Sequence, residues 1–235
     1  MIVLKTIREQ ILELIEAELS KITLANGYST NIGQRVVRDY YDQYPAELPC
    51  VVMISDQDTA DRYTSHAELH IPLIIEGLMR YGTHSPAREG EKILGDLITC
   101  MTAPRIDLDF INGYRNPATG YTLTGATSGA TCVLESVSVA SGSWTLHNAA
   151  GTFRVRLPWG TFQANENILN EGSEIVAELP GTLTRVMPFS DMVNDIEYQR
   201  GGMITLPDPG ELYIKVTTQF DVHYVILQGN PYRQS

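Results

Sequence analysis

The feature that most constrains the fold is an alternation of apolar and polar residues in LYIKVTTQFDVHYVIL, residues 212–227. Every second residue from Ile214 to Ile226 is apolar except Thr218, and most of the residues between them are polar. A period of two predicts a strand with one buried and one solvent-facing side. The stretch is much longer than the usual strand of about five or six residues. We therefore predict the central strand of an antiparallel sheet, with helices covering its apolar face.

Two amphipathic helices are predicted to supply that cover. Residues 5–24 and 86–102 both carry isoleucine and leucine at spacings of three and four, with charged side chains between them. Residues 50–54 and 65–77 predict strands, separated by the polar turn SDQDTADRY. Pro72 lies inside the second of these strands, and because proline cannot donate to a ladder, it predicts a sheet edge or a kink.

The middle of the chain has a different composition. Residues 113–184 are rich in Gly, Ser, Thr and Ala and contain the short strand-like runs TCVLESVSV, SWTLHN, TFRVRL, NENIL and EIVAEL. Close, even spacing of such runs is typical of a small all-β module. We therefore predict an α+β protein with an antiparallel or mixed sheet flanked by two helices. Its discontinuous host domain comprises residues 1–110 plus 186–235, and residues 111–185 form an inserted β-sandwich or barrel.

The net charge and the cysteine content limit which classes of function are plausible for this chain. The chain has 17 Lys+Arg and 28 Asp+Glu, a formal net charge of −11. This excess of negative charge argues against specific nucleic-acid binding, which requires a basic face. It is compatible with a channel wall along which DNA slides without adhering, because like charges repel. Cys50, Cys100 and Cys132 are far apart and predict buried free thiols. No apolar run approaches the roughly 20 residues that cross a bilayer, so we expect a soluble protein made in the cytoplasm.

One set of side chains is a candidate metal site. His66, Glu68 and His70 occupy positions i, i+2 and i+4 of a predicted strand, so they share one face and can reach a metal ion there. The alternative is the ordinary polar face of a half-buried strand. We favour that alternative because no fourth ligand or supporting partner is identifiable.

Other candidates lack parts of the sites that they resemble. Asp56, Asp58 and Asp61 form a D-x-D-x-x-D run without the glycine and closing glutamate of a calcium loop, which favours a solvated turn. Trp144 and Trp159 suit a sugar-binding surface but are also typical of a small β core. No catalytic, cofactor-binding or metal-binding residue is predicted, and we expect no enzyme.

The order of the host segments carries a resemblance. These segments are the first helix, YPAELPCVVMI, HAELHIPLIIEG, REGEKILGDLITCM and IEYQRGGMITLPDPGELYIKVTTQFDVHYVI. Together they resemble the tail terminator, or tail completion, proteins of long-tailed bacteriophages, over about residues 1–105 and 190–228. The insert, with its GATSGAT opening and its G-x-F-x-x-x-E-x-I close, resembles small β modules of phage structural proteins.

The resemblance implies a structural protein of the virion. Members of the family form a ring, expected here to be a homo-hexamer, that caps the tail tube protein and joins it to the connector or neck protein on the head side. DNA passes through the lumen, and neither a cofactor nor a membrane is implied. The expected location is the tail or neck of a virion assembled in the host cytoplasm. The insert departs from a simple terminator and is expected to decorate the ring or contact a neck, collar or sheath protein.

Three alternatives remain open. The nearest is another head–tail joining, neck or collar protein. The second is a metal-dependent hydrolase that uses His66, Glu68 and His70. The third is a carbohydrate-binding module in residues 113–184 that uses Trp144 and Trp159.

Overall fold

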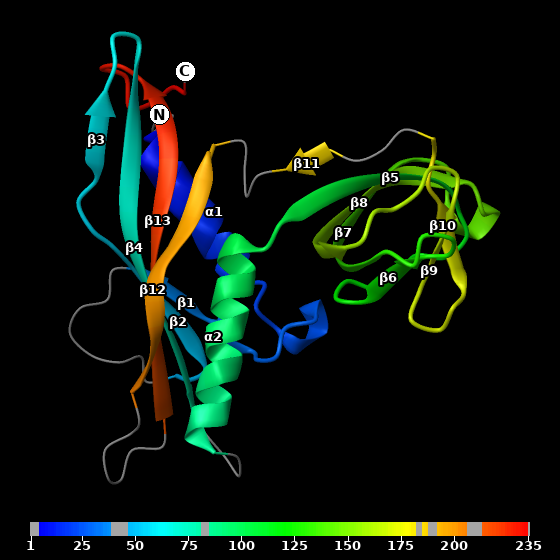
Figure 1. The fold of residues 1–235 in the computed structure, drawn as a ribbon, viewed down its shortest axis with the longest axis horizontal. Coiled ribbons are helices and arrows are strands. Elements are labelled where there is room, and N and C mark those ends of the chain that lie inside the picture. Colours follow the sequence, from blue (N-terminus) through cyan, green and yellow to red (C-terminus); the bar gives the residue numbers. More distant parts are fainter. Residues whose placement is uncertain are drawn as a thin grey trace. The chain divides into compact units, whose positions relative to one another are not determined.

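The chain forms two compact units in an α+β fold (Figure 1). The computed structural model describes residues 5–38, 47–80, 85–181, 185–187, 192–205 and 213–234. Unit 1 comprises residues 1–24, 28–102 and 189–235, and unit 2 comprises residues 25–27 and 103–188. Unit 2 is thus inserted between elements of unit 1. The predicted insert boundary at residue 111 falls within a strand of unit 2 that starts at Arg105.

The sheet of unit 1 is built around the predicted central strand. Its strands are β1 (Val36–Arg38), β2 (Cys50–Ser55), β3 (Thr59–Arg62), β4 (His66–Arg80), β12 (Asp195–Thr205) and β13 (Tyr213–Leu227). The order is β1-β2-β4-β13-β12, with β3 also paired to β4. β13 lies between β4 and β12 and is antiparallel to both, which confirms an interior antiparallel strand, although β4 and not β13 is the middle strand of this order. Only the β1–β2 pair is parallel among the described pairings of this sheet.

Two helices, α1 (Ile7–Leu19) and α2 (Pro86–Thr102), pack on the apolar face of this sheet (Figure 1). The second agrees with its predicted range. The first begins where the Thr6 hydroxyl accepts a hydrogen bond from the Glu9 amide, and it ends at Leu19 rather than at residue 24. The shared core contains Ile11, Ile15, Leu97, Cys100, Ile71, Ile75, Val216, Phe220 and Val222. The even-numbered side of β13 is therefore the buried side.

Pro72 lies in an interior strand, not at an edge. β4 pairs along one side with β13 and along the other with β2 and then β3. Pro72 falls in the break between β2 and β3, where its carbonyl accepts a hydrogen bond from the Asp56 amide. The nitrogen and carbonyl of one strand residue point to the same side, so the missing N–H faces the break. β3 itself was predicted as part of a polar turn. Its TADR sequence has no apolar alternation, and each of its four residues is exposed.

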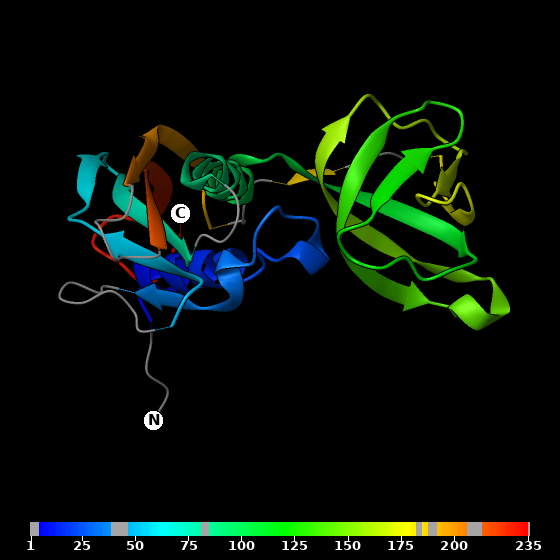
Figure 2. The same ribbon diagram turned by 90° about the horizontal axis from the view of Figure 1, so that it is seen from below.

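Unit 2 is an all-β barrel (Figure 2). Its strands are β5 (Arg105–Gly113), β6 (Thr122–Gly125), β7 (Thr131–Ser141), β8 (Ala149–Trp159), β9 (Asn167–Leu169), β10 (Ile175–Glu178) and β11 (Arg185–Met187). The order is β10-β9-β6-β7-β8-β5-β11, and β10 also pairs with β5, which closes the ring of strands. All described pairings in it are antiparallel. The core contains Phe110, Leu123, Phe153, Val155, Phe162 and Ile168.

The predicted strand SWTLHN is instead a 3-10 turn, Trp144–Leu146. The Ser143 hydroxyl accepts a hydrogen bond from the Leu146 amide, and His147 adopts a left-handed φ of 57°. A serine cap followed by a left-handed residue stops an extended chain, although the apolar residues here suggest a strand.

Candidate functional site

The face of the sheet opposite the helices carries the polar half of the alternation. On β13 this half includes Asp221 and His223, and on β4 it includes His70. The register places His70 directly opposite His223 and Pro72 opposite Asp221. Directly opposed residues of an antiparallel pair have Cβ atoms only about 4.5–5.5 Å apart, so three ionisable side chains converge here.

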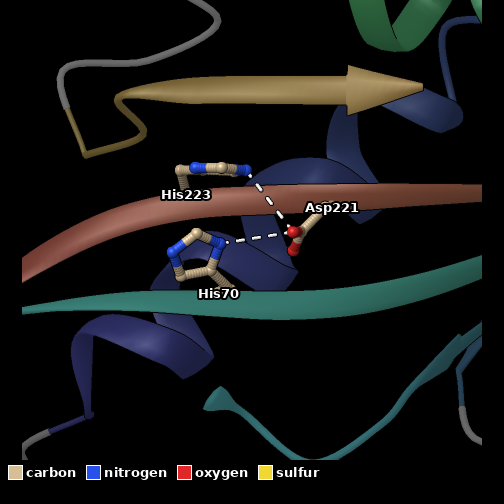
Figure 3. A group of neighbouring side chains, drawn as sticks. All are labelled: His70, Asp221 and His223. Carbon is tan, nitrogen blue, oxygen red and sulfur yellow. Dashed lines mark hydrogen bonds and ion pairs between the residues drawn. The ribbon is translucent and has the colours of Figure 1, made fainter. Parts of the chain in front are cut away.

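The three side chains form a compact group (Figure 3). His70 Nδ1 lies 3.2 Å from Asp221 Oδ2, and His223 Nε2 lies 3.5 Å from the same oxygen. The two imidazole rings have centroids 4.1 Å apart and are tilted by 56°. The side chains are each about a quarter exposed, at 26%, 24% and 26% for His70, Asp221 and His223. The carboxylate therefore lies within reach of both rings.

Two polar atoms of this group are shielded from solvent and have no hydrogen-bond partner. They are Asp221 Oδ1 and His223 Nε2. Leaving such an atom unsatisfied costs about 1–3 kcal/mol. Among the described residues, this is the one group of three His, Cys, Asp or Glu side chains whose ligand atoms lie within 4.8 Å of one another. Imidazole nitrogen and carboxylate oxygen are both common ligands of Zn²⁺ and related divalent transition-metal ions.

Further carboxylates lie around the group. The register places Asp195 of β12 opposite His223, and Glu197 opposite Asp221. Opposed residues share a face of the sheet, so both acids flank the group from β12. On the other side, Asp61 of β3 is opposite Glu68 of β4. These acids add negative charge around the group, while Arg200, which lines a hollow together with Asp221, contributes the opposite charge.

The predicted set His66, Glu68 and His70 does not converge. His66 Nε2 lies 3.7 Å from Glu68 Oε1, and the His66 ring stacks on Tyr63 at 4.7 Å. His70 instead contacts β13. Residues i and i+4 of a strand are about 13 Å apart along its axis, which is too far for one ion. The prediction that these residues share a face is correct, but the partners of His70 come from another strand.

The predicted aspartate run does not form a calcium loop. Asp58 Oδ1 accepts from Arg8 Nε at 2.9 Å, and Asp58 Oδ2 accepts from the Tyr224 hydroxyl at 2.9 Å. Asp56 contributes its backbone carbonyl, which accepts from Arg8 at 3.0 Å, and Asp61 lies in β3. Burial and the bond to Asp58 raise the pKa of Tyr224. These contacts tie α1 and β13 to the loop before β3.

A buried glutamate ties two loops of unit 2 together, and no role was predicted for it from the sequence. Glu166 is 3% exposed. Its carboxylate accepts from the amides of Thr127, Ser128 and Gln163 at 3.1, 2.9 and 2.6 Å, and from the Ser128 hydroxyl at 2.9 Å. Burial acts to raise the pKa of Glu166, but these hydrogen bonds outweigh it and hold the pKa below its ordinary value. The glutamate of the G-x-F-x-x-x-E-x-I close thus clamps the GATSGAT loop.

The aromatic residues of unit 2 divide between core and surface. Phe153 and Phe162 are buried, and Trp144 is half-buried and stacks on Phe110 with centroids 5.2 Å apart. Trp159 is 78% exposed. Of the two tryptophans suggested for sugar binding, one therefore packs against the core.

The three cysteines are buried free thiols, as predicted. Burial raises the pKa of Cys50 to about 11 and that of Cys132 to about 12. Both thiols are therefore protonated and inert at neutral pH.

No protein-family model matches this chain, and no curated protein matches it. Within the part of the chain that the structure describes, no helix has the length and apolar character needed to cross a membrane.

Proposed function

We propose that the chain is a structural protein of a phage virion, a tail terminator whose copies form a hexameric ring. In this role it caps the tail tube and joins it to the connector or neck protein. The proposal starts from the sequence resemblance. The order of elements in unit 1 supports it. This order is α1, the first strands, α2, and then β12 and β13 after an inserted β unit.

The main structural support for a ring is the edge of the unit 1 sheet formed by β12. β12 pairs only with β13 among the described strands, so its other side is available to a strand or loop of another copy. Repeating one such heterologous contact by rotation closes a ring. A formal net charge of −11 suits a ring with DNA passing through it, because like charges limit adhesion.

Two bulges in β12 restrict which partner this edge accepts. The register with β13 shifts between Tyr198 and Arg200 and again between Gly201 and Met203. Gln199 is thus left without a residue opposite it, and its side chain is exposed. Bulges twist an edge and limit indiscriminate pairing. A specific neighbour is therefore favoured over open aggregation.

The mass of the purified full chain tests this proposal. We expect six-fold rings in native mass spectrometry and electron microscopy. The variant Gln199→Pro is expected to reduce ring formation at least about tenfold, since proline is tolerated at a bulge and discourages the addition of a strand at a sheet edge. Gln199→Ala is the matched control and should assemble normally. A strict monomer at high concentration contradicts the proposal, and rings of another symmetry favour a different head–tail joining, neck or collar protein.

A further inference from the structure

We propose that His70, Asp221 and His223 form a binding site for a divalent transition-metal ion, of which Zn²⁺ is the first choice, that links β4 to β13. This departs from the sequence prediction of no metal-binding residue. It does not rest on the proposed ring.

The distances between the ligand atoms suit such an ion. Four ligands at about 2.0–2.1 Å around a tetrahedral Zn²⁺ lie roughly 3.3 Å from one another. The two measured separations from Asp221 Oδ2 are 3.2 Å to His70 Nδ1 and 3.5 Å to His223 Nε2. All ligand atoms of the group lie within 4.8 Å. Small rotations of the side chains are sufficient to place them around one ion.

The unsatisfied atoms favour a ligand over a self-contained hydrogen-bond group. His223 Nε2 and Asp221 Oδ1 have no hydrogen-bond partner although both are shielded. An ion between the rings and the carboxylate would use the lone pair of His223 Nε2 and neutralise Asp221. Its charge is also favoured by Asp195 and Glu197, which flank the group from β12.

One coordination position would stay open. Three protein ligands leave the fourth position of a tetrahedral ion for water. Asp221 also lines a hollow of about 420 Å³, together with Pro72, Gln199, Arg200, Gln219 and Phe220. This hollow adjoins the Asp221 side of the group and provides space for the water there, although neither histidine lines it.

The test is titration of Zn²⁺ into the chelator-treated full chain, produced without a polyhistidine tag. We expect one Zn²⁺ per chain by calorimetry, a rise in the thermal unfolding midpoint, and visible absorption typical of four-coordinate Co²⁺ when Co²⁺ replaces Zn²⁺. His223→Gln and Asp221→Asn should each weaken binding by at least about 100-fold, because even the loss of an outer partner costs about 10–100-fold.

His66→Gln is the matched control, since His66 lies on the same face of β4 outside the group. It should bind Zn²⁺ within about threefold of the natural chain. The unfolding midpoint of each variant without metal shows whether the variant is folded. His70→Gln removes the third ligand and should also abolish the visible absorption of bound Co²⁺. The proposal is overturned if the natural chain binds no stoichiometric Zn²⁺, or if His66→Gln weakens binding as much as His223→Gln does.

Discussion

Each unit holds a carboxylate among other polar groups, but the two carboxylates differ in how completely their hydrogen-bonding capacity is satisfied. Glu166 in the barrel accepts four hydrogen bonds, three of them from backbone amides. Asp221 on the sheet contacts two imidazoles and keeps one oxygen without a partner. A fully satisfied carboxylate fixes the local fold, whereas one with spare capacity is available to a ligand.

Glu166→Gln should produce the largest effect on stability. The amide presents donors to backbone donors, so the free energy of unfolding of unit 2 should fall by about 2–4 kcal/mol. Faster hydrogen exchange at the amides of Thr127, Ser128 and Gln163 would report it. Glu174→Gln is the control: Glu174 pairs with Arg115 at the surface and should matter by less than about 1 kcal/mol. If the two substitutions lower the free energy of unfolding equally, Glu166 has no special structural role.

Acid should destabilise unit 2 through the same residue, by less than the substitution does. The pKa of Glu166 is lowered in the folded chain, so its contribution is complete above the ordinary glutamate pKa of about 4.5 and is lost as pH falls through the lower folded value. Hydrogen exchange of the 125–130 loop between pH 5 and pH 2 measures this loss. In Glu166→Gln the pH dependence of that loop should be flatter, and an unchanged profile would assign the acid sensitivity to other carboxyls.

Asp221→Asn should have the smallest effect in the absence of metal. The side chains that Asp221 contacts are about a quarter exposed, so removing the charge should change the free energy of unfolding by less than about 1 kcal/mol. Chemical denaturation of the chelator-treated chain measures it. A loss as large as that of Glu166→Gln would show that Asp221 is structural and would end the contrast between the two carboxylates.

Local pattern predicted most of unit 1 and only part of its site. The alternation in β13 and the helical spacing in α2 are strong because many residues repeat one rule. β3 and the turn at Trp144–Leu146 were misassigned. The four residues of β3 show no period, and at the turn a serine cap outweighs the apolar content. His70 was found from its strand, but its partner Asp221 lies 151 positions away, and strand register at that distance is not encoded by local pattern.

The insertion of unit 2 between the strands of unit 1 has a consequence during translation. Glu76 of β4 and Lys215 of β13 are neighbours in the sheet but 139 positions apart in the chain. At about 5–20 residues per second, the ribosome needs on the order of ten seconds to make that interval. The barrel can fold in this time, but the edge of β4 that pairs with β13 stays unpaired until β13 has been made. An unpaired strand edge invites wrong pairing, so this interval is when the nascent chain is most prone to misassembly.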